Sequence, residues 1–593
     1  MSSRISIGAL VALVGLGALL RLDAFTGHYG TLEHPAWARV ATRDIAPAAR
    51  RVRPGSVAWA PIADPYVGGD PINYLKFARE MRTFYQPHVR EPVFLAVTRI
   101  ALALLDDQDA AVSLASAAGS LLLIVGAYLL GAELISPLAG LASAAVMAID
   151  YDLVTWAPDG WRDDMFSATV ALAAWAFVRF RRHPSFGNAL LVGFTSGAAC
   201  LTRITAVSFA LPALLWVSAA GPGAVRPRLE YAAVALVVLA AIVGPFLLSC
   251  AIATGDPLYA IDYHTVYYRA ADGLSVSTPM SAGEYLWGKF AAHPLGTLDA
   301  GITGEFVRPF TIKWNGLRIW AAWLPAATAA AALLGLLMLP FTADGRLLLL
   351  MLLGSLLPYV FTWNIAAGGE WRFTMHAYPF YVVAACFAVA GVARLIRALV
   401  TQPASWRARA MWLGVRAGIV CALVAAAVVV YVGVLPWFVA SEAIGKGDSV
   451  SIGTGGRDRA FYRSGWSRAH SEGIVTVRVS IAPRAAVSIP LPVRRAYDLV
   501  LRLDPAAPAD GQSMTVLFNQ QIVLSTTLDW NAQRVGAYRL HVPIEWMRTG
   551  RNDLVIVPTP TVAAATADSR FSWLRPDQRL GVRIWMVRVI PLT

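Results

Sequence analysis

One carboxylate in the sequence is placed where it could act as a general base. Asp70 follows two glycines and precedes a proline, at the start of a segment compatible with a helix. A carboxylate on such a loosened loop can take a proton from an attacking hydroxyl. A structural role stays open, because aspartate is a favoured helix N-cap and proline is common at the first helical position. Asp70 is therefore the first candidate for a catalytic residue.

A second charged cluster, Asp159-Gly-Trp-Arg-Asp-Asp-Met165, separates two long apolar runs. Acidic residues are favourable at the start of a helix, so a solvated turn is one interpretation. The other is a binding site, because two adjacent carboxylates beside a guanidinium at a membrane boundary suit a divalent cation or a hydroxylated substrate. This pattern predicts that Arg162, Asp163 and Asp164 bind substrate, with Asp164 as the ligand if a metal takes part.

Lone arginines recur where apolar runs end. Arg203 and Arg372 are the first candidates for contacting a phosphate and Arg90 is the third; Glu91 and Glu370 stand next to two of them. A single arginine in such a place often only extends its charge to the interface. Several that converge on one cavity would instead form a clamp, because a guanidinium presents paired donors that match phosphate oxygens.

These residues need elements that bring them together, and the composition indicates a membrane protein. The 593 residues are 57% hydrophobic and 15% charged, with a mean hydropathy of +0.55, which excludes an ordinary soluble or disordered chain. The apolar residues form runs without Asp, Glu, Lys or Arg, most of them long enough to span a bilayer as a helix. These runs cover residues 5–20, 110–132, 134–149, 165–178, 183–202, 204–225, 231–255, 319–343, 347–369, 373–393 and 417–441.

The basic residues predict which loops share a side. Residues 92–105 are too short for a full crossing and suit an interfacial helix. With eleven spans and a cytoplasmic N-terminus, short inner segments then hold eleven arginines and short outer loops hold three, as the positive-inside rule requires. The outer face receives a large loop at 21–109 and a long segment at 254–316. His264, in the latter, could cover the site and contact a sugar, or belong to an interfacial aromatic cluster.

The tail has a different pattern. Alternating β-branched runs at 474–479, 497–503 and 583–589, with a hairpin signal at 516–524, predict a soluble β-sandwich over 441–593, after a transmembrane domain over 1–440. Its aromatic residues could bind glycan, although tryptophan in a small sandwich is most often core. These aromatic residues are Tyr462, Trp466, Trp530, Trp546 and Trp573.

Taken in order, these pieces resemble the C-type-fold glycosyltransferases that use polyprenyl-phosphate sugars. The dolichyl-phosphate-mannose protein mannosyltransferases and the lipid A aminoarabinose transferases belong to this class. The resemblance rests on the carboxylate before Asn73-Tyr74, Arg90-Glu91-Pro92, a run ending at Gly131, and Arg162 to Met165. It covers about residues 1–210, with Trp371-Arg372-Phe373 as a further match. The chain departs from the family pattern at Pro71 and at Glu91-Pro92-Val93.

The resemblance implies a polytopic α-helical protein of the C-type fold with a C-terminal jelly-roll-like domain and its site on the outer face. The compact loops and the composition rich in Ala and Arg predict a bacterial inner membrane. The resemblance also implies inverting transfer of one hexosyl or pentosyl unit from a polyprenyl-phosphate donor to an acceptor hydroxyl of a cell-envelope glycan, lipid or protein. Asp70 would be the base, Tyr74 would contact substrate, and a divalent cation could assist without any organic cofactor. Transfer of a whole lipid-linked glycan is the alternative, and transport is a weaker one.

Overall fold

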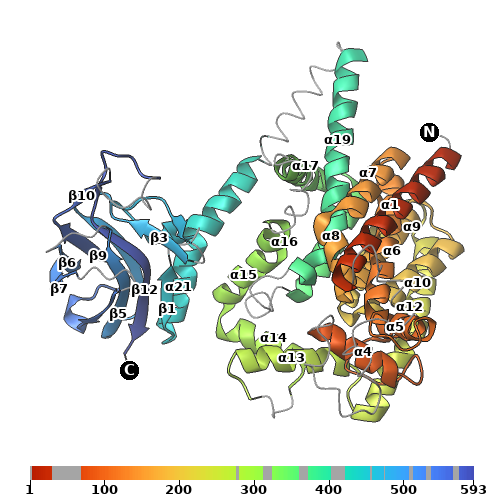
Figure 1. Cartoon of the computed structure of the whole chain (residues 1–593), viewed down its shortest axis with the longest axis horizontal. Coiled ribbons are helices and arrows are strands. Elements are labelled where there is room, and N and C mark those ends of the chain that lie inside the picture. The colour runs from red at the N-terminus through yellow and green to blue at the C-terminus, as the bar shows by residue number, and fades with distance from the viewer. Residues whose placement is uncertain are drawn as a thin grey trace. The chain divides into compact units, whose positions relative to one another are not determined.

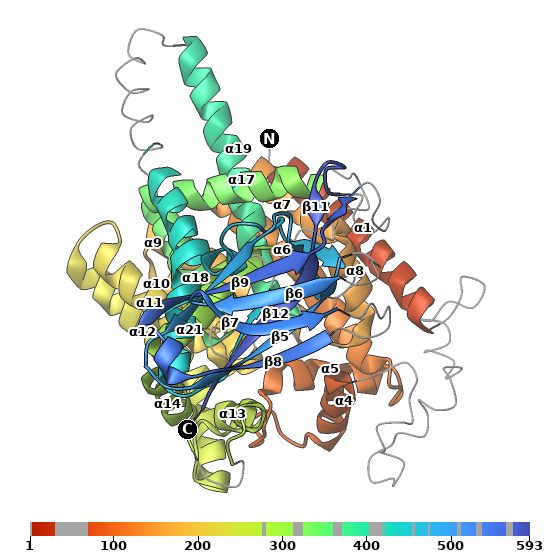
Figure 2. The same ribbon diagram turned by 90° about the vertical axis from the view of Figure 1, so that its left-hand side faces the viewer.

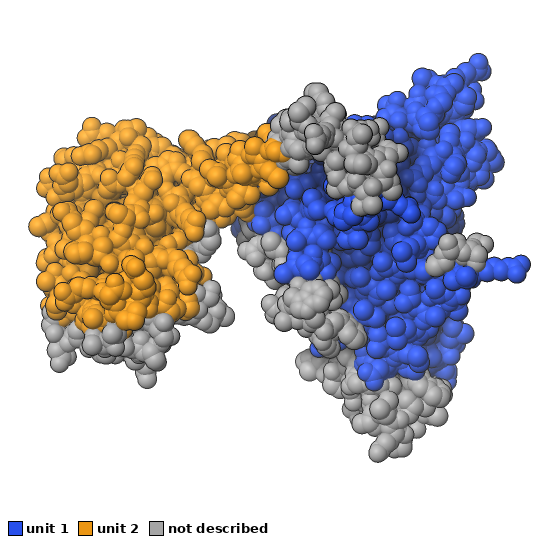
Figure 3. Space-filling view, turned by 90° about the horizontal axis from the view of Figure 1, so that it is seen from above, with its two compact units in different colours: residues 1–287, 300–407 blue, residues 288–299, 408–593 orange. Residues whose placement is uncertain are grey.

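The computed structural model describes most of the chain. The described residues are 3–29, 69–275, 280–311, 324–359, 371–401, 418, 421–453, 457–472, 475–506, 512–528, 536–564 and 573–592. Over these ranges the chain forms two compact units, coloured separately in Figure 3. The helical unit contains residues 1–287 and 300–407, and the C-terminal unit contains residues 288–299 and 408–593.

The first part of the chain is α-helical (Figure 1). The helices described up to residue 401 are α1 (Ser3–Tyr29), α4 (Asp70–Glu80), α5 (Pro92–Leu104), α6 (Ala111–Leu134), α7 (Pro137–Ile149), α8 (Tyr151–Trp156), α9 (Asp163–Arg182), α10 (Phe186–Thr202), α11 (Val207–Ala220), α12 (Val225–Thr254), α13 (Tyr259–Ala271), α14 (Ala282–Ala292), α15 (Pro294–Ile302), α16 (Arg308–Thr311), α17 (Leu324–Met338), α18 (Ala343–Leu356) and α19 (Tyr378–Thr401).

Helix α6 is central to the packing of this unit. It lies against α1, α5, α7 and α9. The face that α9 buries is rich in alanine, with Ala168, Ala171 and Ala174 fully buried and Phe166 and Phe177 filling the space between helices. Small residues let helix backbones approach closely, which is how helices associate where both neighbours and lipid are apolar.

Several helices can cross a membrane. In the part of the chain that the structure describes, five helices are long and apolar enough, or seven if each of two bent pairs is one span. The five are Arg4–Phe25, Ala111–Leu134, Val225–Thr254, Phe373–Arg397 and Cys421–Gly445, and the bent pairs lie at 137–159 and 326–359. The apolar runs at 165–178, 183–202 and 204–225 also form helices, but these are shorter or carry more charge. The sequence prediction of eleven spans therefore stays a prediction.

Helices α4 and α5 form a small layer of their own at one end of the unit. The expected short segment at 92–105 is the 13-residue helix α5. Its buried side chains Phe94 and Leu95 pack with Tyr74 and Leu75 of α4. The long segment at 254–316 is helical rather than an open loop where it is described, and it contains α13 to α16.

The C-terminal unit is built on antiparallel sheets (Figure 2). Within the described residues, one sheet has the order β2-β3-β12-β5-β8 with β1 also paired to β12, and the other has the order β4-β9-β6-β7. The strands, with helix α21 before them, are α21 (Leu435–Gly445), β1 (Val450–Gly453), β2 (His470–Glu472), β3 (Val475–Val479), β4 (Ala485–Leu491), β5 (Tyr497–Pro505), β6 (Ser513–Phe518), β7 (Gln521–Thr527), β8 (Gly536–Val542), β9 (Gly550–Thr559), β10 (Val562–Ala563), β11 (Arg579–Leu580) and β12 (Val582–Pro591).

The expected strands and hairpin of this unit are present. The hairpin of β6 and β7 turns at Asn519 and Gln520, both with positive φ, as a two-residue hairpin loop requires. Leu501 of β5 and Phe518 of β6 are fully buried in one core that both sheets share. Alternate residues of each strand point inward, so the period-two pattern in the sequence corresponds to this core.

The aromatic residues proposed for glycan contact are mostly structural. Tyr462 and Trp466 are buried in the core of the C-terminal unit, Trp546 packs against that core, and Trp573 stacks on the ring of His470. Trp530 lies outside the described residues. A ring that is buried cannot stack on a sugar, so Tyr462 and Trp466 are not glycan contacts.

Candidate active site

The turn before α9 packs against the start of α4, which brings two of the sequence motifs together. Gly160 has φ of 81°, and a Cβ there would lie 2.9 Å from Val112 and 3.3 Å from Cβ of Pro71. A Cβ at Gly69, just before α4, would likewise lie 3.3 Å from the ring of Trp161. Only glycine fits this conformation and space without a shift. The carboxylate loop and the Arg-Asp-Asp cluster are therefore neighbours in space.

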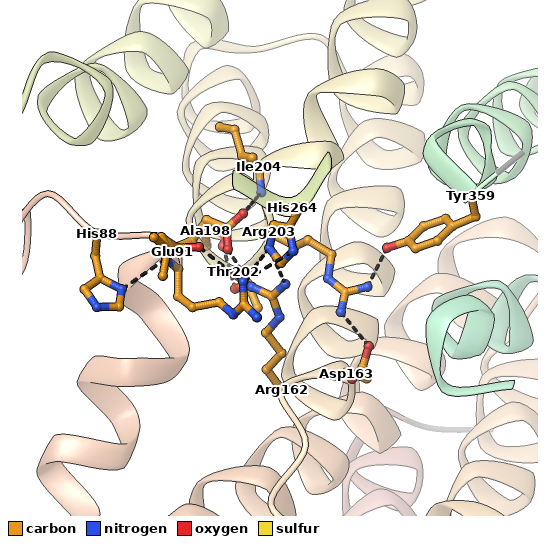
Figure 4. A network of polar contacts seen from close by, with 12 residues as sticks. His88, Glu91, Arg162, Asp163, Ala198, Thr202, Arg203, Ile204, His264 and Tyr359 are labelled. Atoms are coloured by element: carbon orange, nitrogen blue, oxygen red, sulfur yellow. Dashed lines mark hydrogen bonds and ion pairs between the residues drawn. The ribbon is translucent and has the colours of Figure 1, made fainter. Parts of the chain in front are cut away.

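Glu91, the residue before α5, ties three elements together (Figure 4). Its Oε2 accepts a hydrogen bond from Nη1 of Arg162 at 2.5 Å, and its Oε1 accepts one from the backbone N–H of Ile204 at 2.8 Å. The side chain of Glu91 is only 1% exposed and that of Arg162 only 6%. Both carboxylate oxygens of Glu91 are thus bound within the protein. One binds the turn before α9 through Arg162, and the other binds the break between α10 and α11 through Ile204.

Arg203 lies next to this pair, where α10 ends. Its Nη2 donates to Oδ1 of Asp163 at 2.8 Å and its Nη1 donates to the hydroxyl of Tyr359 at 2.5 Å. The guanidinium also lies over the rings of Phe166 and Tyr359, at 5.2 and 5.8 Å from their centroids. An arginine held on two sides in this way presents a fixed orientation.

Arg90 and His264 complete the cluster. Nη1 of Arg90 donates to Nε2 of His264 at 2.8 Å, and Nη2 of Arg162 lies 3.4 Å from the same atom. The guanidinium groups of Arg90 and Arg162 lie 6.0 and 5.8 Å from the ring centroid of Tyr74. Burial, and then the three neighbouring arginines, hold the pKa of His264 well below its usual value, so the ring is neutral at pH 7.

The three arginines of this cluster are not all in contact with a carboxylate. Among the described residues, Glu91 pairs with Arg162 and Asp163 pairs with Arg203, whereas Arg90 has no carboxylate at ion-pair distance. Burial, and then the charge of Arg162, lower the pKa of Arg90 from its usual value. A partly buried cation with no carboxylate in contact is costly unless a partner arrives. Arg90 is therefore the arginine of the cluster whose charge Asp70 and Glu91 offset only from beyond ion-pair distance.

Unpaired donors point to the same conclusion. The Nε atoms of Arg90, Arg162 and Arg203 are buried, and each is without a hydrogen-bond partner in the described part of the chain. Buried donors are rarely left unpaired in folded proteins, because each costs free energy. Three such donors beside an arginine that no carboxylate contacts fit an anion with several oxygen atoms, such as a phosphate.

Asp70 lies beside this cluster as the first residue of α4. Its carboxylate acts electrostatically on both Tyr74 and Arg90. The N-cap of α4 is Gly69, with Asp70 and Pro71 following it in the first turn, so the capping role that the sequence left open for Asp70 belongs to Gly69. A base at this position would face the arginine cluster from the α4 side.

Asp164 lies apart from the cluster of Arg90, Arg162 and Arg203. It is fully buried and its Oδ2 accepts a hydrogen bond from the hydroxyl of Ser116 on α6 at 3.0 Å. Within the described residues, no three His, Cys, Asp or Glu side chains gather as a metal ion would require. The residues described do not fit a metal centre at Asp164, and no step below is derived through a metal.

Some predicted site residues cannot be placed and others were missed. Glu370 and the side chain of Arg372 lie outside the described residues. Tyr359 was not predicted because it lies within an apolar run, where a tyrosine gives no signal of its own. The backbone N–H of Ile204 is likewise invisible in a sequence. The structure brings together the candidates Asp70, Tyr74, Arg90, Glu91, Arg162, Asp163, Arg203 and His264.

A family model gives an independent comparison. Residues 86–248 match the model described as dolichyl-phosphate-mannose-protein mannosyltransferase. This match confirms the resemblance that the sequence motifs indicate, over less than half of the chain. The matched segment contains Arg90, Glu91, Arg162, Asp163 and Arg203. No curated protein shows significant similarity to the chain.

Three solved structures give further, weaker likenesses. An archaeal oligosaccharyltransferase, AglB from Archaeoglobus fulgidus with an inhibitory peptide and a dolichol-phosphate, is 16% identical with a TM-score of 0.39; the match covers 71% of this chain and 55% of that one. ArnT from Cupriavidus metallidurans bound to undecaprenyl phosphate is 16% identical with a TM-score of 0.39, covering 75% and 76%. The arabinosyltransferase EmbB from Mycobacterium smegmatis is 12% identical with a TM-score of 0.24, covering 100% and 64%. All three TM-scores lie below 0.5.

Proposed function

We propose that this chain is a membrane glycosyltransferase that moves one sugar from a polyprenyl-phosphate donor to an acceptor hydroxyl, with inversion, on the outer face of a membrane. The observation that carries the proposal is that Arg90, within the cluster of Arg90, Arg162 and Arg203, has no carboxylate in contact, while the buried Nε of each arginine has no partner in the described part of the chain. The family-model match over 86–248 supports the same class of donor.

The arginine cluster would act on the leaving group. A lipid phosphate leaves readily once its growing negative charge is stabilised, so the enzyme needs fixed positive groups more than a strong acid. Glu91 and Asp163 are positioning residues in this scheme, because they hold Arg162 and Arg203 in place. Neutral His264 orients Arg90 without competing for the anion, since an uncharged ring adds no second charge beside it.

Asp70 would act on the acceptor. The acceptor oxygen forms a bond to the anomeric carbon while the bond from that carbon to the phosphate oxygen breaks. The electron pair of the broken bond leaves with the lipid phosphate, and the proton of the acceptor hydroxyl passes to the carboxylate of Asp70. Attack on the face opposite the phosphate gives inversion.

The test measures release of the lipid phosphate from a panel of radiolabelled polyprenyl-phosphate sugars. Purified protein in nanodiscs is supplied with cell-envelope extract, and the Arg90→Gln variant is compared with wild type. We expect wild type to consume at least one donor and Arg90→Gln to lose about 10²–10³-fold in rate, the usual effect of removing one charge-stabilising donor.

The matched control is Arg226→Gln. Arg226 is 92% exposed and pairs only with Glu230, one turn along the same helix, so its loss should leave the rate unchanged. If wild type neither binds nor consumes any donor of the panel, the donor assignment is wrong. Equal rates for Arg90→Gln and wild type would remove the arginine cluster from the mechanism.

A further inference from the structure

An open cavity lies between the end of α4 and the exposed face of α5. It has a volume of about 740 Å³, and its lining includes Arg82, Phe84, Arg99 and Ile100. It shares no residue with the arginine cluster of the candidate active site. We refer to it as the α4–α5 groove.

Two of the charged residues that line the α4–α5 groove have an ion-pair partner of their own. Arg79, at its inner wall, is neutralised by Asp107 and Asp109, at 3.0 and 2.5 Å. Glu80, the carboxylate in the lining, lies 4.0 Å from Lys76.

Arg82 and Arg99 have no such partner. Arg99 donates from Nη1 to the backbone oxygen of Arg79 at 3.1 Å, which fixes its guanidinium against the groove. Among the described residues neither Arg82 nor Arg99 has a carboxylate at ion-pair distance. Both side chains belong to exposed residues, so their charges are available to an anion from outside.

The surroundings of these charges are apolar and exposed. Phe84 is 40% exposed, Ile100 is 61% exposed and Leu104, one turn further along α5, is 73% exposed. Helix α5 has 13 residues, too few to cross a bilayer, and its other face is buried against α4. A short helix with one apolar face open and arginines beside it is typical of helices that lie in the membrane interface.

We propose that the α4–α5 groove binds the headgroup of an anionic phospholipid. Its phosphodiester lies between Arg82 and Arg99, and an acyl chain lies along Phe84, Ile100 and Leu104. The charge of the groove matches such a headgroup, and the exposed apolar side chains match the chain that is attached to it. The site anchors α4 and α5, which carry Asp70 and Glu91, at the surface of the membrane. This inference does not depend on the proposed transfer activity.

The test is native mass spectrometry of the full-length protein in detergent, titrated with phosphatidylglycerol or with phosphatidylcholine of the same acyl chains. We expect the wild type to bind phosphatidylglycerol more tightly. The Arg82→Gln/Arg99→Gln double variant should lose about 25-fold in that affinity, or about fivefold for each arginine. The Arg82→Lys/Arg99→Lys variant should keep most of the preference, because the charge remains.

Two further variants separate this site from others. Arg226→Gln removes an exposed arginine elsewhere and should leave phosphatidylglycerol binding unchanged. Arg90→Gln should also leave it unchanged, which distinguishes the groove from the candidate donor site. The inference is overturned if the wild type binds both lipids equally, or if the folded double variant, checked by its melting temperature, binds phosphatidylglycerol as the wild type does.

Discussion

At the scale of single residues, the charge on Arg90 decides what the candidate site can bind. Its neighbours Arg162 and Arg203 each have a carboxylate, and only Arg90 relies on an uncharged ring. A site arranged in this way favours an anion over a neutral or cationic ligand by Coulomb attraction, which is stronger away from bulk water. This preference would hold for any phosphate-bearing donor, whatever sugar it carries.

The first prediction concerns Asp70. If its carboxylate is the base, Asp70→Asn should lower the transfer rate by about 10²–10⁴-fold while lipid-phosphate binding stays intact, because the amide cannot accept the proton. Transfer is measured with the labelled donor and binding by titration with the lipid phosphate alone. Asp577→Asn, at a side chain 76% exposed in the C-terminal unit, is the matched control. Loss of binding together with transfer would assign Asp70 a structural role instead.

The second prediction concerns His264 and pH. Because its pKa in the folded protein is held well below 6.5, the folded state takes up fewer protons than the unfolded state as the pH falls. The stability that the neutral ring contributes is present above pH 6.5. It is lost as the pH falls below that value, by up to about 1.4 kcal/mol per pH unit for this one group.

The measurement is the melting temperature between pH 7.5 and 5, for wild type and His264→Asn. The variant should show a shallower fall, since an amide does not titrate. His88 contributes in the same direction, because burial and then Arg90 lower its pKa to about 4, so some slope should remain. Identical slopes for the two proteins would mean that His264 is not a neutral partner of the arginines.

At the scale of elements, Glu91 links three segments of the candidate site. It connects the start of α5 with the turn before α9 through Arg162, and with the break between α10 and α11 through Ile204. The three segments are far apart in the sequence, and the pair of Arg203 and Asp163 adds a second link between two of them. These buried carboxylates therefore set where the arginines stand relative to one another.

The third prediction follows from this connection. Glu91→Gln keeps a hydrogen-bond acceptor for Ile204 but leaves the charge of Arg162 buried and unpaired, which should cost about 3 kcal/mol of stability. Thermal unfolding of the purified protein measures it. Glu80→Gln makes the same chemical change at an exposed side chain 4.0 Å from Lys76 and should change stability by less than about 1 kcal/mol. If the two variants lose the same amount of stability, Glu91 does not link these segments in the way proposed.

At the scale of the whole molecule, the chain does not divide at a single point. Residues 288–299 group with the C-terminal unit although they lie between two parts of the helical unit. Arg457 holds them there: it pairs with Asp299, donates to the backbone oxygen of Tyr431 at 3.1 Å and lies 4.0 Å from the centroid of that ring. Glu442 adds a second connection by accepting from the backbone N–H of Gly296 at 3.0 Å.

The fourth prediction tests this division of the chain. Arg457→Ala should speed amide hydrogen exchange of residues 294–299 about tenfold, because the ion pair and the contact with the Tyr431 ring are lost together. Exchange in α4 and α5 should not change. Arg459→Ala, at an exposed neighbour, is the control. Unchanged exchange at 294–299 in Arg457→Ala would show that another contact holds the segment.

The sequence by itself determined the features that depend on local pattern. Long apolar runs became helices, period-two runs such as 497–503 became strands, and the hairpin at 516–524 turns where expected. These follow from hydrophobic periodicity and turn preference, which act over a few residues. The same local logic identified Arg90, Arg162 and Arg203 as charges at the ends of helices.

Only the tertiary structure decided how those charges are paired. Nothing in the spacing shows that Glu91 takes Arg162, that Asp163 takes Arg203, or that His264 stands against Arg90 rather than in an aromatic cluster. These contacts join residues 40 to 174 positions apart. They depend on how the helices pack, and packing is set by the fit of many side chains at once. Because Arg90 is left without a contacting carboxylate only after that pairing, the proposed anion site depends on the fold.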